Sequence, residues 1–269
     1  MSLSKAEEAK EEIEEVLHSS PRQYGVARSR WRLTDIGAVV PWLKQCTEAG
    51  ISQILKRLGI RMKQTISFVR SPDPEYVVKR RRMLHLFGAA IYHPDENVML
   101  FQDELTYYSQ PEPTSVFAPV GQNSPYLSRT AGENKMTRIG AVMDGFTGQV
   151  TYLQRDKFGK EAMADLYRQI RRLYPDRRLF VVQDNCNFHY SDNVLATADR
   201  LDIQPVFLPT YASWLNPIEK LWRWLKADVL HGHDFAHDYR LLRQVVAEFL
   251  DQFANGSRSL LRYTGLLPV

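Results

Sequence analysis

Two acidic residues follow short apolar segments, in positions that suit metal-dependent chemistry. Asp103 comes directly after residues 98–102, and Asp184 comes directly after residues 179–183. Each segment has the length and composition of a buried strand. We therefore expect each carboxylate at the C-terminal end of its strand, where open α/β sheets bind their ligands. Two such carboxylates on neighbouring strands repel each other unless cations lie between them, and oxygen ligands of this kind suit Mg²⁺ or Mn²⁺.

A third acid, Glu219, lies in the segment Asn216-Pro217-Ile218-Glu219, with 34 residues between it and Asp184. Local helix capping is a sufficient explanation for this segment. Asn216 suits the N-cap, Pro217 the first helical position and Glu219 the third. The two roles are compatible, because a glutamate in a first helical turn can also point out from the edge of a sheet.

The elements predicted around these acids are those of an α/β domain. Residues 106–134 are rich in Pro, Ser, Gly and Asn and are predicted to be irregular. Hydrophobic periodicity predicts the order strand, strand, strand, helix, strand, helix, strand, helix, helix. The strands are expected at 98–102, 136–143, 150–153, 179–183 and 204–208, and the helices at 160–173, 191–201, 214–230 and 239–253.

The N-terminal part is predicted to be a small all-α unit, with helices at 4–19, 34–39 and 47–58. Three short helices fit a helix-turn-helix module whose last helix enters the DNA major groove, and they fit a bundle used only for packing equally well. The apolar side of the last helix would leave three polar residues on its open face, namely Gln53, Lys56 and Arg57.

A hinge is predicted at residues 71–75, Ser-Pro-Asp-Pro-Glu, followed by a helix that carries Lys79, Arg80, Arg81 and Arg82. After an acidic first 20 residues, the chain up to residue 95 is basic, and the remainder is close to balanced. The basic block indicates contacts with DNA phosphates, although a solvated linker would also explain it.

The composition is that of an ordinary globular protein, with 44% apolar and 25% charged residues. The two cysteines, Cys46 and Cys186, lie far apart, which indicates a reducing compartment and no zinc site. No apolar run approaches the roughly 18 residues that span a bilayer, and the acidic N-terminus is unlike a signal peptide. We therefore expect a soluble cytoplasmic protein without a membrane partner.

Together, the acidic motifs resemble those of the mariner superfamily of transposases, specifically the bacterial insertion sequence 630 group. The 34-residue gap between the second and third acids is typical of that superfamily. The segments that carry the resemblance cover nearly the whole chain: Phe101-Gln102-Asp103-Glu104, Val182-Gln183-Asp184-Asn185, Asn216-Pro217-Ile218-Glu219, Leu55-Lys56-Arg57-Leu58-Gly59-Ile60 and Ser71-Pro72-Asp73-Pro74-Glu75-Tyr76.

The resemblance implies an α/β fold in which a ribonuclease-H-like domain, a mixed five-stranded sheet with flanking helices, follows a small all-α helix-turn-helix domain. We expect the DNA-binding domain at residues 1–70, a linker helix at 71–95 and the Asp–Asp–Glu catalytic domain at 96–269. Members of the family usually carry a further N-terminal helix-turn-helix, and this chain begins at what resembles the second one.

The implied activity is metal-dependent cleavage at transposon ends and strand transfer into target DNA, at TA dinucleotides. Asp103 would bridge two Mg²⁺ or Mn²⁺ ions, and Asp184 and Glu219 would each favour one. The partners would be double-stranded DNA and a second copy of the chain in the synaptic complex, near the bacterial nucleoid. Four further residues are expected to support the metal ligands or contact phosphate, with helix capping or simple exposure as the alternatives: Glu104, Asn185, His189 and Asn216.

Two other functions fit part of these observations. A ribonuclease-H-like endonuclease without strand transfer would use the same three acids, but it would have no need of the N-terminal DNA-reading module. A transposase-derived DNA-binding protein would have no need to keep the acids.

Overall fold

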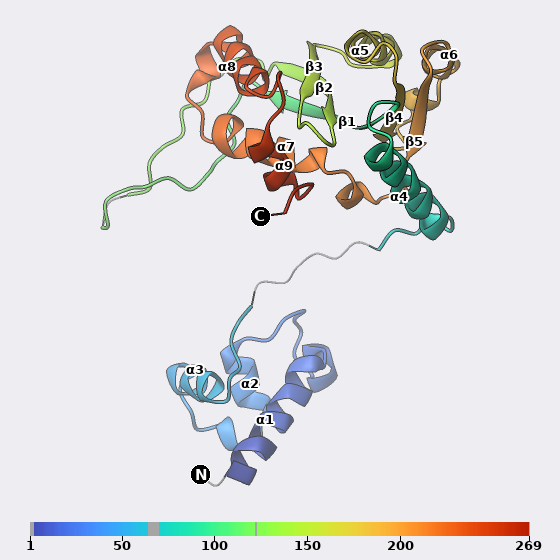
Figure 1. Cartoon of the computed structure of the whole chain (residues 1–269). Coiled ribbons are helices and arrows are strands. Elements are labelled where there is room, and N and C mark those ends of the chain that lie inside the picture. The colour runs from blue at the N-terminus through green and yellow to red at the C-terminus, as the bar shows by residue number, and fades with distance from the viewer. Residues whose placement is uncertain (1–2, 64–69, 122, 269) are drawn as a thin grey trace. The chain divides into compact units, whose positions relative to one another are not determined.

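The computed structural model describes residues 3–63, 70–121 and 123–268 and divides into two compact units, residues 1–68 and 69–269 (Figure 1). None of the described helices is long and apolar enough to cross a membrane.

The N-terminal unit consists of helices α1 (Leu3–His18), α2 (Leu33–Val39) and α3 (Glu48–Arg57), with short turns η1 (Pro21–Tyr24) and η2 (Pro41–Leu43). Its core includes Ile13, Leu43 and Ile51. The Thr47 hydroxyl caps α3 by accepting a hydrogen bond from the Gly50 amide at 3.2 Å. These helices match the predicted ones to within one or two residues at each described end.

A close crossing of α2 and α3 depends on a glycine. A Cβ atom added at Gly37 would lie 2.6 Å from Cδ1 of Ile51, which is closer than real carbon contacts allow. The absent side chain at Gly37 therefore lets the apolar side of α3 face inward, as predicted.

The C-terminal unit is built on one five-stranded sheet in the order β3-β2-β1-β4-β5. The strands β1, β2 and β3 pair antiparallel, whereas β4 and β5 extend the sheet in parallel with β1. Their bounds are Asn97–Tyr108, Met136–Asp144, Val150–Arg155, Arg178–Gln183 and Ile203–Phe207 for β1 to β5. This is the mixed five-stranded sheet that the sequence predicted.

Helices cover both faces of the sheet (Figure 1). Helices α5 (Lys160–Leu173) and α6 (Asp192–Arg200) cover one face; α4 (Tyr76–Tyr92), α7 (Ile218–Leu225), α8 (Tyr239–Asp251) and α9 (Arg258–Thr264) cover the other. Alternate residues of β1 enter the two cores, with Met99 and Phe101 facing α7 and α8, and Val98 and Leu100 facing α5. This alternation follows from the two-residue period of a strand.

Strand β1 is longer than predicted. It continues to Tyr108, so that Asp103 and Glu104 lie within the strand and not after it. The extension has a partner, because β2 pairs with β1 from Leu100 to Tyr108. The parallel pairing with β4, by contrast, ends at Phe101 and Val182, and this end of the parallel ladder corresponds to the strand end that the sequence predicted.

The single helix predicted at 214–230 is three shorter pieces: η4 (Ser213–Leu215), α7, and a π-helical turn η5 (Lys226–Leu230). Helix α7 begins after Pro217, and the Asn216 side chain does not cap it. The Asn216 amide instead donates a hydrogen bond to the backbone oxygen of Gln102, at 2.9 Å. The predicted capping role of Asn216 is therefore wrong, because a buried contact with β1 takes its side chain.

Candidate active site

The sheet register places Asp103 and Asp184 at the same level on adjacent strands. The last paired residues of β1 and β4 are Phe101 and Val182, and each acid follows two positions later. Asp103 alternates with Phe101 and Leu105, so its side chain belongs to the side of the sheet covered by α7. Asp184 directly follows the end of β4.

Helix α7 reaches Asp103 through a tryptophan. The Trp222 indole N–H donates a hydrogen bond to Oδ2 of Asp103 at 2.9 Å. Burial, followed by the negative charges of Glu219 and Glu104, raises the pKa of Asp103 from 3.8 to about 8. In the absence of a cation, the Asp103 carboxyl is therefore mostly protonated at neutral pH.

Glu219 lies in the first turn of α7, which Asn216 attaches to β1 beside Asp103. Burial raises the pKa of Glu219, and the charge of Asp184 acts in the same direction. Glu219 therefore interacts electrostatically with both aspartates.

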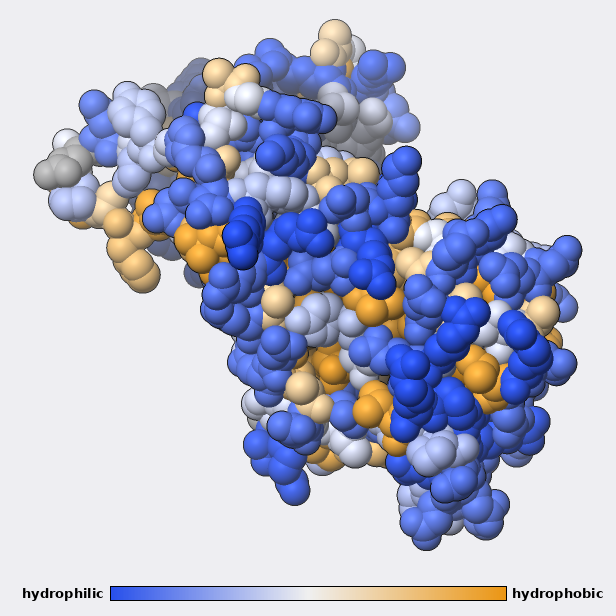
Figure 2. Space-filling model, turned by 90° about the horizontal axis from the view of Figure 1, so that it is seen from above, coloured by the Kyte–Doolittle hydropathy of each residue, from blue (hydrophilic) through white to orange (hydrophobic). Residues whose placement is uncertain are grey.

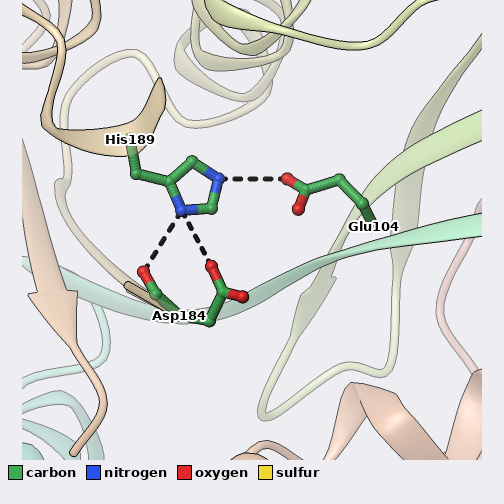
Figure 3. Close-up of side chains that lie close together, drawn as sticks. All are labelled: Glu104, Asp184 and His189. Carbon is green, nitrogen blue, oxygen red and sulfur yellow. Dashed lines mark hydrogen bonds and ion pairs between the residues drawn. The ribbon is translucent and has the colours of Figure 1, made fainter. Parts of the chain in front are cut away.

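A compact cluster joins Asp184 to Glu104 through His189 (Figure 3). Nδ1 of His189 lies 3.1 Å from Oδ1 of Asp184, and Nε2 lies 3.1 Å from Oε1 of Glu104. His189 comes from the short helix η3 (Asn187–Tyr190), and its side chain is completely buried. The imidazole thus holds the two carboxylates at a fixed separation.

The electrostatics of this cluster favour a protonated histidine. Burial alone would lower the pKa of His189, but its hydrogen bonds with Asp184 and Glu104 outweigh burial and raise the pKa to about 10. The hydrogen bond from His189 in turn lowers the pKa of Asp184. Gln102 adds a further donor by bonding to Oε1 of Glu104 through Nε2. Asp184 is therefore ionised and oriented before any ligand arrives.

The predicted supporting residues play different parts. Neither Asn185 nor His189 caps helix α6, whose N-terminus has no side-chain cap. Asn185 donates to the backbone oxygen of Leu208 at 2.7 Å and accepts a hydrogen bond from the Tyr190 hydroxyl. Asn185 therefore braces the loop after β5.

The predicted DNA-binding residues lie on two helices. Gln53, Lys56 and Arg57 are exposed along α3 and line a groove on its surface. On α4, Arg80, Arg81 and Arg82 are exposed. Lys79 differs, because its ammonium group pairs with Asp73 at 2.8 Å and is only partly exposed.

Two cations near Glu219 were not singled out from the sequence. Arg223 and Lys226 are exposed, and their positive charges lower the pKa of Glu219. They lie four and seven residues after Glu219, the spacing of one helix face, so this periodicity could have identified them.

The donor set suits a hard divalent cation. Oδ1 of Asp184 accepts a hydrogen bond from the Cys186 amide at 2.9 Å and faces His189. Among the described residues, its Oδ2 has no hydrogen-bonding partner, and the Asp103 carboxylate accepts a hydrogen bond from Trp222 at Oδ2. Carboxylate oxygens are the type of ligand that Mg²⁺ and Mn²⁺ prefer.

Solved structures show the same fold. The chain matches "Mos1 transposase paired-end complex with left transposon end" and "Crystal structure of the Mos1 mariner paired end complex with Mn" with a TM-score of 0.65 in each case. Each match has 15% sequence identity and covers 96% of this chain and 75% of the other. The C-terminal unit accordingly has the ribonuclease-H-like fold.

Sequence comparison identifies the family. "Insertion element IS630 uncharacterized 39 kDa protein" of Shigella sonnei is 21% identical over 254 residues, which cover 92% of this chain and 73% of that protein. The family model described as "DDE superfamily endonuclease" matches residues 98–242, more than half of the chain and all three candidate acids. The chain therefore belongs to the DDE superfamily endonucleases.

Proposed function

We propose that this chain is a transposase that cleaves DNA at the ends of an insertion element and joins them to target DNA. The observation that carries the proposal is the position of Asp103 and Asp184, level with each other on adjacent strands, with Glu219 on a helix attached to β1. The relatives named for insertion elements and transposase–DNA complexes support it.

Asp103, Asp184 and Glu219 would hold two Mg²⁺ or Mn²⁺ ions, in the proposed catalytic domain 96–269. Bound there, two divalent ions activate a water molecule and stabilise charge on the departing 3′ oxygen. Trp222 orients Asp103 through Oδ2, and His189, itself held by Glu104, orients Asp184 so that its Oδ2 is free. Asn216 supports Glu219 by fixing the start of α7.

The DNA phosphates near the acids would pair with Arg223 and Lys226, because these cations lie within electrostatic range of Glu219. Further along the duplex, we assign contacts to Gln53, Lys56 and Arg57 of the proposed DNA-binding domain 1–70. The exposed arginines of α4, within the proposed linker 71–95, would follow the DNA backbone. Lys79 would serve mainly to hold Asp73.

A second copy of the chain is the proposed partner in the synaptic complex. The segment between β1 and β2 projects from the unit (Figure 1) and carries the exposed apolar residues Val116, Phe117, Val120 and Tyr126. Figure 2 shows a mostly hydrophilic face with small and scattered apolar groups. Apolar side chains on a projecting segment favour burial against a partner.

The test is cleavage of a DNA duplex that carries the inverted repeats flanking this gene, with Mg²⁺, Mn²⁺ or EDTA. We expect nicking with either metal and none with EDTA. Asp184→Asn should abolish nicking and leave gel-shift affinity within about twofold, because affinity depends on Lys and Arg residues. Asp199→Asn, at an exposed acid on α6, is the matched control and should nick normally.

The products decide between the proposed activity and its alternatives. A target plasmid is supplied in the reaction. Products in which the element end is joined to that plasmid would establish strand transfer, and sequencing their junctions would show whether insertion occurs at TA. Nicking without joined products would indicate an endonuclease only. Binding without nicking in any metal would indicate a DNA-binding protein and contradict the assignment of the three acids.

A further inference from the structure

A pocket of about 600 Å³ opens beside the candidate metal site. It is formed where the end of β4 meets the loop between β5 and α7. Asp184 belongs both to this pocket and to the acidic site, so an occupant would lie next to the bond that is cleaved. Its lining also includes Asn185, Leu208, Thr210, Tyr211, Ser213 and Trp214.

Two aromatic side chains of the pocket are open to solvent. Tyr211 is 74% exposed and Trp214 is 50% exposed, although the other two tryptophans of this region, Trp222 and Trp224, are buried or partly buried in the core. Large aromatic side chains left outside the core offer flat surfaces on which another ring can stack.

The backbone presents Tyr211 in an uncommon conformation. Its φ angle is +54°, in the left-handed region that bulky residues rarely adopt. Such a conformation persists only where the surrounding structure enforces it, and it recurs at functional sites.

Hydrogen bonds from the linker enforce the shape of this loop. The Thr210 amide donates to Oδ2 of Asp73 at 2.8 Å, and the Ser71 hydroxyl donates to the Thr210 oxygen at 2.6 Å. Lys79 pairs with the same Asp73 oxygen at 2.8 Å, and its hydrogen bond holds the pKa of Asp73 well below the ordinary value. The aromatic side chains are therefore presented on an anchored loop.

The opposite wall is braced as well. Asn185 is bonded to the Leu208 oxygen and to the Tyr190 hydroxyl, and the Tyr190 ring stacks on Phe207 with centroids 4.1 Å apart. These contacts keep the pocket open without an occupant, as in most ligand sites that form before binding.

The chemistry of the lining selects the kind of occupant. All of the lining residues are described in the structure, and they include no Lys or Arg, while Asp184 contributes a negative charge. A phosphate group would therefore be repelled, whereas a neutral aromatic ring could stack on Tyr211 or Trp214. Hydroxyl and amide groups of Thr210, Ser213 and Asn185 could serve its polar edge.

We propose that this pocket takes one unstacked nucleobase of a DNA strand, next to the phosphate that is cleaved or joined at Asp184. The inference rests on the proposed function, because it assigns the base to the DNA that this site acts on. Enzymes that must reach one position in a duplex often take a base out of the stack and hold it against aromatic side chains. The base could belong to the element end or to the target duplex.

Photocrosslinking tests the proposal and separates the two sources. 5-Iodouracil is placed singly at each position around the cleaved bond of the element end in one series, and around the insertion point of a target duplex in the other. The full-length protein is bound in Ca²⁺ and irradiated, and the crosslinked residue is identified by mass spectrometry. We expect a crosslink to Tyr211 or Trp214 in one series, and that series identifies the source.

Binding measurements with the same duplexes supply an independent readout. Tyr211→Ala and Trp214→Ala should weaken binding roughly 5- to 150-fold, the range typical of one lost base–aromatic stack. Tyr211→Phe and Trp214→Phe retain a ring and should stay within about threefold of wild type. Tyr92→Ala removes an 82% exposed tyrosine at the far end of α4 and is the matched control.

Failure of this inference differs from failure of the proposed function. If the wild type nicks DNA with Mg²⁺, but neither series crosslinks to the loop and the alanine variants bind normally, the nucleobase pocket is wrong and the transposase assignment stands. If the wild type nicks nothing in any metal, the proposed function and the pocket assignment both fall.

Discussion

Replacing Asp103 with asparagine should stabilise the metal-free protein, although it would destroy the proposed metal site. The amide oxygen of the introduced side chain could still accept the hydrogen bond from Trp222 that now goes to the Asp103 carboxylate. Unlike the carboxylate, the amide is uncharged, so the variant has no negative charge at this buried position beside Glu219 and Glu104. The gain in stability should grow as the pH rises.

The magnitude follows from the pKa of Asp103, which burial raises from 3.8 in the unfolded chain to about 8 in the fold. Between these values the folded state holds a proton that the unfolded state has lost. The free energy of unfolding therefore falls by about 1.4 kcal/mol for each pH unit. The stabilisation from the protonated carboxyl is fully present below pH 3.8 and is lost as the pH approaches 8.

From pH 6 to pH 8, wild type should lose about 2 kcal/mol through this group, because the folded carboxyl itself titrates near pH 8, and Asp103→Asn should lose none of it. For a unit of this size the gap between their melting temperatures should widen by roughly 5–10 °C. Scanning calorimetry in EDTA, from pH 6 to pH 8, measures that gap, with Asp199→Asn as the control. Parallel curves for the Asp103→Asn variant and wild type would refute the burial and crowding of Asp103.

Three further changes test other parts of the structure. Lys56→Ala combined with Arg57→Ala should weaken DNA binding and reduce the slope of log affinity against log salt by about 2; an unchanged slope would leave α3 as a packing helix. His189→Ala should weaken Mn²⁺ binding about 10–100-fold, measured by calorimetry, because Asp184 loses the hydrogen bond that orients it as a metal ligand. Partial recovery in His189→Asn, which keeps a donor near Asp184, is expected, and equal losses in the two variants would argue against orientation by hydrogen bonding. Gly140→Ala should cost about 1–3 kcal/mol in a denaturant titration, since its Cβ would lie 2.0 Å from the Phe158 ring. An unchanged midpoint would mean that β2 and Phe158 separate easily.

Local patterns in the sequence were sufficient for most elements of the fold. Short apolar segments predicted all five strands, and those at 98–102 and 179–183 are apolar up to their last residue because both faces of the strand enter a core. The helical spacing of Ile51, Ile54, Leu55 and Leu58 predicted the buried side of α3. The acidic motifs and their separation indicated the family, to which the match over residues 98–242 assigns the chain.

Tertiary structure alone decided how the candidate site is assembled. The length of β1 depended on its pairing with β2, and the role of Asn216 depended on Gln102 of a distant strand. The hydrogen bonds that shape the site join residues 85, 114, 119 and 137 positions apart in the chain. A sequence pattern reports which neighbours within a few residues share a face, but it contains no information about which distant donor will reach a given carboxylate. For this reason the sequence could indicate Asp103, Asp184 and Glu219, while the buried His189 between two carboxylates and the anchored loop of Tyr211 emerged only in the folded chain.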